Sequence, residues 1–130
     1  MEPVLSDPVL RFRPDTVRAV RAMYGLDGPG RMAEAVDLLD DWVKKQPHFM
    51  MKDFSRRFLE TTIIASKGSV EKAKSRMDKY CTVRSMVPSF FDKLNILTDL
   101  NEATLPMFYM TVLPKLDRDH NRIIFMKLNN

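Results

Sequence analysis

The chain has 130 residues, of which 45% are apolar and 29% charged, so it is long and apolar enough to bury one hydrophobic core. A net charge of +4 and an isoelectric point near 9.3 make it mildly basic, which permits an anionic partner without requiring one. The single cysteine excludes a disulfide framework and a cysteine-based zinc site, and it is typical of a protein in a reducing compartment.

The N-terminal sequence contains acidic residues and prolines and no apolar stretch that could serve as a secretory signal. The longest apolar run, residues 107–113, is too short to cross a bilayer. We therefore predict a cytoplasmic protein.

An irregular arm is predicted for residues 1–13, because Pro3 and Pro8 disfavour regular structure. Pro14 is suited to the first position of a helix that continues to Tyr24 and ends at a glycine-rich turn. The next helix is predicted at residues 32–45, and Pro47 stops it. Its apolar residues recur on one stripe, as in a helix half buried against others: Ala35, Val36, Leu39, Trp42 and Val43.

Two further helices are predicted at residues 53–65 and at 70 to about 84, the second with Ser69 as its N-cap. Residues 89–94 follow as one or two more helical turns. The large side chains on the apolar faces are the predicted core: Trp42, Phe54, Phe58, Leu59, Met77 and Tyr80.

The C-terminal third has one convincing strand, at residues 123–128, and no evident partner for it. Residues 101–103 could open a helix, although Pro106 restricts its position. Met107 and Met110 lie in an apolar segment without a clear cover, which leaves them open to a role in binding. The strand would pair with another chain, or the fold would continue beyond Asn130.

No catalytic or metal-binding motif is recognisable. Asp117, Asp119 and Asn121 have the spacing of a calcium loop, but the glycine and glutamate that such a loop needs are missing, so a polar turn is expected. The two histidines lie far apart in sequence, and Cys81 falls on a buried helical stripe as a small hydrophobe. We predict no enzyme activity, no metal and no cofactor.

A basic stripe is predicted on the last long helix, at Lys72, Arg76 and Lys79, which follow one another at helical spacing. A stripe of this kind can be a solvated face, or it can contact phosphates of lipid or nucleic acid. Glu71 and Asp78 flank the stripe and the net charge is modest, so no nucleic acid partner is expected.

Several segments in order resemble the N-terminal helical region of the CRAL-TRIO (Sec14-like) lipid carriers, in particular the insect alpha-tocopherol transfer protein-like and retinaldehyde-binding-like group. They are DWVKKQPHF from Asp41, RFL from Arg57, KGSVEKAKSRMDKY from Lys67, and Arg84 followed by PSFF. The later segment LPKLDRDHNRIIFMKL, residues 113–128, resembles the entry into that family's lipid-binding domain and its first strand.

The resemblance implies a non-enzymatic carrier of a hydrophobic small molecule such as a tocopherol, retinoid or phospholipid, with transient contact to a phosphoinositide-containing membrane. The family's pocket would lie beyond Asn130, so no ligand-binding residue is assigned. In the family a basic residue often precedes the last long helix, a place that only Lys67 can fill here. The set implied for anionic lipid is therefore Lys67, Lys72, Arg76 and Lys79.

The predicted fold is mainly α: a small antiparallel helical bundle of the CRAL-TRIO N-terminal type, followed by the first strand of a truncated α/β lipid-binding domain. The predicted domains are an arm at 1–13, a helical domain at 14–94, and a connecting segment with the incomplete lipid domain at 95–130. The predicted function is the N-terminal portion of a lipid-transfer protein that cannot enclose ligand by itself. The alternative is a helical protein-interaction module that dimerises or docks a partner through its C-terminal segment. The oligomeric state is left open.

Overall fold

The computed structural model describes residues 10–92 and 107–129. It divides into a helical unit, Val17–Asp92, and a second unit made of the start of the chain and its C-terminal segment. The predicted mainly helical fold is confirmed. Within the described residues, no helix is long and apolar enough to cross a membrane. Residues 1–9 of the predicted arm at 1–13, and the predicted helix start at 101–103, lie outside the described residues.

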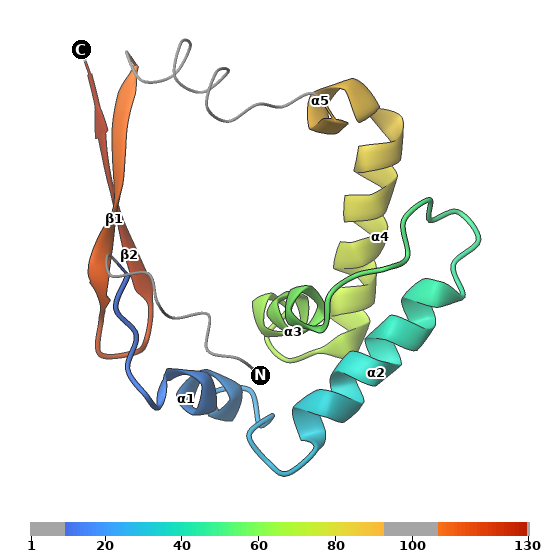
Figure 1. The fold of residues 1–130 in the computed structure, drawn as a ribbon, viewed down its shortest axis with the longest axis horizontal. Coiled ribbons are helices and arrows are strands. Elements are labelled where there is room, and N and C mark those ends of the chain that lie inside the picture. The colour runs from blue at the N-terminus through green and yellow to red at the C-terminus, as the bar shows by residue number, and fades with distance from the viewer. Residues whose placement is uncertain (1–9, 93–106, 130) are drawn as a thin grey trace. The chain divides into compact units, whose positions relative to one another are not determined.

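Five helices are described along the chain, drawn in Figure 1: α1 (Thr16–Ala22), α2 (Arg31–Lys44), α3 (Arg56–Ala65), α4 (Val70–Met86) and α5 (Pro88–Asp92). Their order and approximate bounds agree with the sequence prediction. The third begins three residues later than expected, because Ser55 is its N-cap and accepts a hydrogen bond from the Phe58 amide at 3.2 Å. Ser69 caps α4 in the same way, as predicted, by accepting from the Lys72 amide.

The turn between α3 and α4 is fixed by a glycine. The Gly68 amide donates to the Ile63 carbonyl and the Lys67 amide to the Ile64 carbonyl, which closes the end of α3. Gly68 has φ +77°, and a Cβ there would lie 2.7 Å from the Tyr24 Cβ. Both the backbone angle and the close approach therefore require glycine.

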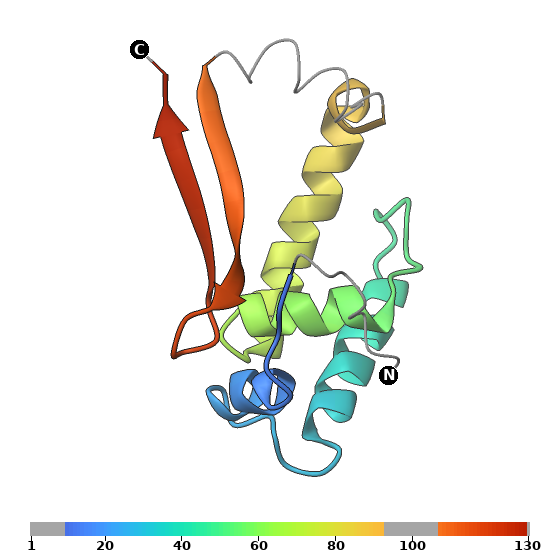
Figure 2. The ribbon, with the colours of Figure 1, turned by 60° about the vertical axis from the view of Figure 1, so that its left-hand side comes forward.

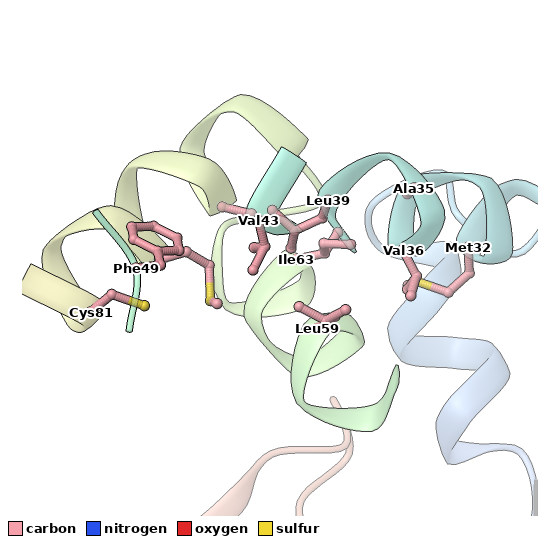
Figure 3. Close-up of a cluster of buried hydrophobic side chains, with 11 residues drawn as sticks. Met32, Ala35, Val36, Leu39, Val43, Phe49, Leu59, Ile63 and Cys81 are labelled. Atoms are coloured by element: carbon pink, nitrogen blue, oxygen red, sulfur yellow. The ribbon is translucent and has the colours of Figure 1, made fainter. Parts of the chain in front are cut away.

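The core lies between α2, α3 and α4. Figure 3 shows Leu39 and Val43 of α2 meeting Ile63 and Leu59 of α3. These four side chains are almost completely buried. The remaining members of the cluster come from α2, the loop after it and α4: Met32, Ala35, Val36, Phe49, Ala73, Met77 and Cys81.

Two of the six predicted core residues, Leu59 and Met77, are fully buried. The others are partly buried and pack against the cluster: Trp42, Phe54, Phe58 and Tyr80. Three of them form a row of rings, in which Phe58 stacks on Phe54 at 5.1 Å and contacts Tyr80 at 5.6 Å between centroids. Aliphatic side chains and Met77 fill the centre of the core, and these four rings lie at its margin.

The C-terminal segment corrects the prediction of an unpartnered strand. β1 (Phe108–Leu116) and β2 (Arg122–Leu128) form an antiparallel hairpin, which Figure 2 shows as two adjacent arrows. Phe108 pairs with Leu128 and Val112 with Ile124, and the register then shifts before Leu116. Pro114 lies within this shift, where its missing amide proton costs no ladder hydrogen bond.

Arg122 ties the N-terminal arm to this hairpin. Its guanidinium donates to the carbonyls of Leu113, Pro114 and Arg11, and it lies 4.6 Å from the centroid of the Phe12 ring. The Arg11 amide in turn donates to the Pro114 carbonyl at 2.8 Å. The described part of the arm therefore runs beside the irregular portion of β1.

Candidate functional site

The helical unit carries an apolar groove at the end of α4. The groove has a volume of about 370 Å³ and is lined from three elements: the loop after α2, the last two turns of α4 and the start of α5. Its lining residues are Met50, Met51, Tyr80, Cys81, Arg84, Ser85 and Pro88.

Two methionines form the side of the groove contributed by the loop. Met50 is 88% exposed and Met51 is 46% exposed. The loop is held in place beneath them, because Phe49 is buried in the core and packs edge-on against Trp42. His48 bonds to Asp78 of α4 at 2.7 Å and so fixes the loop to the opposite helix. Two flexible, polarisable side chains are thereby presented to solvent from an anchored backbone.

Arg84 orders the other side of the groove. Its guanidinium donates to the Tyr80 hydroxyl at 2.9 Å and lies 5.3 Å from the centre of the Phe91 ring. It therefore links α4 to α5 through a hydrogen bond and a cation–π contact. The neighbouring hydroxyl of Ser85 is occupied, since it donates to the Cys81 carbonyl.

Cys81 lies at the floor of the groove and is 8% exposed. Burial raises the pKa of its thiol, and the nearby Asp78 carboxylate raises that pKa further. The thiol is therefore protonated at neutral pH, which confirms its predicted role as a buried small hydrophobe. Cys81 therefore adds an uncharged side chain to the groove lining, which suits contact with an apolar surface.

Further apolar side chains are exposed in the last turn of α4, at its C-cap and on α5. They are Val83, Met86, Val87 and Phe90, each between 45% and 75% exposed. They do not line the groove, and the candidate interaction surface is the groove itself. Sequence reasoning missed this site. The available signal was the Met50–Met51 pair in a loop, where no helical periodicity assigns both side chains to the core.

The four cations predicted for anionic lipid line one pocket. Lys67 reaches it from the turn after α3, and Lys72, Arg76 and Lys79 reach it from α4. The stripe predicted from helical spacing is thus joined by a cation from a different element. All four side chains are exposed.

The remaining sequence candidates have structural roles. Asp117 accepts hydrogen bonds from the amides of Asp119 and Asn121, and these bonds, chiefly those from Asn121, lower the pKa of its carboxyl. This is the polar turn that was predicted. His120 contacts the Thr16 hydroxyl at 3.1 Å within the hairpin unit. Among residues 10–92 and 107–129, no group of three or more potential metal ligands is present.

The architecture defines a small helical domain with a closed three-helix core and an exposed apolar groove. Residues 29–100, more than half of the chain, match the protein family described as Pinta-like, UBA domain. The chain therefore belongs to the Pinta-like UBA domain family. It matches no curated protein and no solved structure.

This family assignment corrects the resemblance to the CRAL-TRIO lipid carriers. The helical segments that suggested a lipid carrier fall within the UBA match. The predicted partners, a hydrophobic small molecule and a phosphoinositide-containing membrane, are wrong on the same ground, because UBA domains typically bind ubiquitin or ubiquitinated proteins. The family instead supports a helical protein-interaction module, which was the alternative interpretation.

Proposed function

We propose that the helical unit binds ubiquitin or a ubiquitinated protein through the groove at the end of α4. The family match supports this class of partner. We place the binding surface at this groove because two solvent-exposed methionines, Met50 and Met51, line it opposite Tyr80 and Arg84. The contact is one of binding and involves no chemical step.

The physical basis is the transfer of apolar surface from water. Met50 and Met51 lose most of their solvent contact when a partner covers them, and each buried side chain of this size contributes about 1.5–3 kcal/mol. Phe49 anchors the loop backbone, so the ordering cost that opposes this gain is mainly that of the two methionine side chains, about 0.5–1.5 kcal/mol each. Arg84 adds a polar group at the edge, where hydrogen bonds give orientation.

The test compares two substitutions that each replace an exposed apolar side chain by a carboxylate. Met50→Asp places the charge in the groove, and Leu38→Asp places it on α2 outside the groove lining. We expect Met50→Asp to weaken binding of ubiquitin about ten-fold or more and Leu38→Asp to leave it unchanged, as measured by titration calorimetry. Equal weakening by both variants, or no binding by the unaltered chain, would contradict the proposal.

The exposed apolar side chains of the hairpin favour a second contact, with another copy of this chain. Apolar side chains on both faces of the hairpin are more than half exposed: Tyr109, Met110, Ile124, Phe125 and Met126. A two-stranded hairpin is marginal in water, and outside the irregular portion of β1, where the Arg11 amide donates to Pro114, its outer edges pair with no other described strand. We propose that two chains associate through this segment.

The oligomeric state tests this contact. Light scattering over a dilution series should give a dimer, and Phe125→Lys should give a monomer while the Trp42 fluorescence of the helical unit is unchanged. A monomer at every concentration of the unaltered chain would contradict the proposed self-association and leave the groove proposal untouched.

A further inference from the structure

The basic pocket contains four positive charges that nothing in the described chain neutralises. Lys67, Lys72, Arg76 and Lys79 make no ion pair and no side-chain hydrogen bond with any described residue. Lys74, on the same helix but outside the pocket, does pair with Glu71 at 2.6 Å. The unpaired cations are therefore a property of this pocket and not of α4 as a whole.

Their arrangement costs stability in the absence of a ligand. Lys72 and Arg76 are separated by one helical turn, and Lys79 follows on the same face, so like charges face one another. Lys67 adds a fourth charge from a backbone with φ +56°, a conformation that is unfavourable for a residue other than glycine. An anion bound among these groups would relieve the repulsion between them.

A second observation points to a ligand at the same place. Ser66 lines the pocket and is 5% exposed, and its hydroxyl is buried without a hydrogen-bond partner among the described residues. A buried hydroxyl is normally paired, and the exceptions in folded proteins call for an explanation. Ser75 contributes another hydroxyl to the lining. Lysine, arginine and hydroxyl donors converging on one concavity match the oxygens of a phosphate group.

We propose that this pocket binds the phosphate of a phosphorylated segment of a protein partner. Its volume of about 410 Å³ suits a single phosphorylated side chain. That the phosphate belongs to a protein rests on the proposed function. That the ligand is a phosphate rests on the pocket alone.

A flat anionic surface fits the pocket less well. Glu71 and Asp78 flank the cations on α4, so a membrane laid across this helix would bring carboxylates against anionic headgroups. Ala65 is the only apolar side chain among the described residues that line the pocket. Phe58, Met77 and Tyr80 line an adjoining pocket with Arg76, but they are buried in the core or packed against it and are therefore not free to enter a bilayer. A phosphate on a narrow peptide reaches the cations without meeting the acids.

The experiment is a nuclear magnetic resonance titration of the full chain at constant ionic strength. The probe is a capped alanine–glycine peptide with one phosphothreonine, and its unphosphorylated twin is the control ligand. We expect the phosphopeptide to shift the amide signals of residues 66–79 saturably and the twin to leave them unshifted. Inorganic phosphate should shift the same signals more weakly, because it lacks the peptide's contacts.

Matched variants assign the binding to the pocket. Lys72→Gln and Arg76→Gln should each weaken phosphopeptide binding about ten-fold, since each removes a charge-assisted hydrogen bond. Lys74→Gln makes the same change on the same helix outside the pocket and should have no effect. All three variants should bind ubiquitin like the unaltered chain, which separates this inference from the proposed function.

Three results would overturn the inference. They are the absence of shifts at residues 66–79 with the phosphopeptide, whether or not inorganic phosphate shifts them, equal shifts with the unphosphorylated twin, and equal weakening by Lys74→Gln. The first of these is decisive whatever else the chain binds. Binding to phosphatidylserine vesicles without any response to the phosphopeptide would also overturn it, in favour of a membrane contact.

Discussion

Two adjacent leucines on α2 offer a direct test of the helical core. Leu39 is 0% exposed at the centre of the cluster, whereas Leu38 is 55% exposed on the outer side of the same helix. Both can be replaced by alanine with the same change in composition and in helix propensity. Any difference between Leu38→Ala and Leu39→Ala therefore measures burial.

The expected magnitude follows from the environment of each side chain. Burying a leucine contributes about 1.5–3 kcal/mol, and the cavity left by its removal raises the cost of Leu39→Ala to about 2–5 kcal/mol. Leu38→Ala should change stability by less than about 0.5 kcal/mol, because its side chain is already in water. A small domain has roughly 5 kcal/mol of stability in total, so Leu39→Ala should leave the helical unit close to unfolding.

Urea denaturation followed by Trp42 fluorescence gives both values, because this single tryptophan packs against the core. The slope of the transition should be the same for all three proteins. A difference between the two variants smaller than about 1 kcal/mol would refute the packing of α2 described above.

Three further predictions concern other parts of the chain. Arg122→Gln should release the arm from the hairpin, and the Arg11 amide should then lose its protection against hydrogen exchange; retained protection would show that Arg122 is dispensable. The folded-state pKa of Asp117 is lowered, so its contribution to the turn is present above the ordinary carboxyl pKa of about 4 and is lost as pH falls through the folded value. Asn121→Ala removes the side-chain bond and keeps the backbone bond, so it should bring that pKa part of the way back to its ordinary value, as a carboxyl titration by nuclear magnetic resonance would show. Finally, Cys81 should react with a thiol reagent far more slowly in the native than in the denatured protein, and equal rates would contradict its burial.

The helices were predictable because their signals are local. Ser69 caps α4, and the apolar stripe of α2 gives Ala35, Val36, Leu39 and Val43, all of which are buried. Each of these features acts within a few residues of sequence, and the packing of the three helices strengthens the same pattern. The large aromatic residues were predicted as core but are only partly buried, because a helical stripe shows which face of a helix is buried and not how deeply each side chain on it lies.

The first strand of the hairpin was missed for a different reason. Residues 107–113 are apolar except for Thr111 and do not alternate between apolar and polar, and Pro114 interrupts the sequence where a strand would continue. In the structure that proline occupies the irregular part of the ladder, so it does not end the strand. The position of Pro114 in the irregular part of the ladder is visible only once β1 and β2 are paired. The sequence of β1 alone does not contain that register.

The candidate sites show the same division between local and tertiary information. Helical spacing placed Lys72, Arg76 and Lys79 on one face, but their convergence with Lys67 depends on the turn after α3. The groove depends on the loop after α2 lying against the end of α4, a contact made through the bond between His48 and Asp78. No sequence pattern within either segment encodes that contact.

The most direct test of the central claim is to titrate the isotopically labelled chain with ubiquitin and to map the amide signals that shift. We expect saturable shifts at Met50, Met51 and along residues 80–88, the segments that line the groove. An unchanged spectrum at saturating ubiquitin, or shifts confined to the hairpin, would contradict that claim.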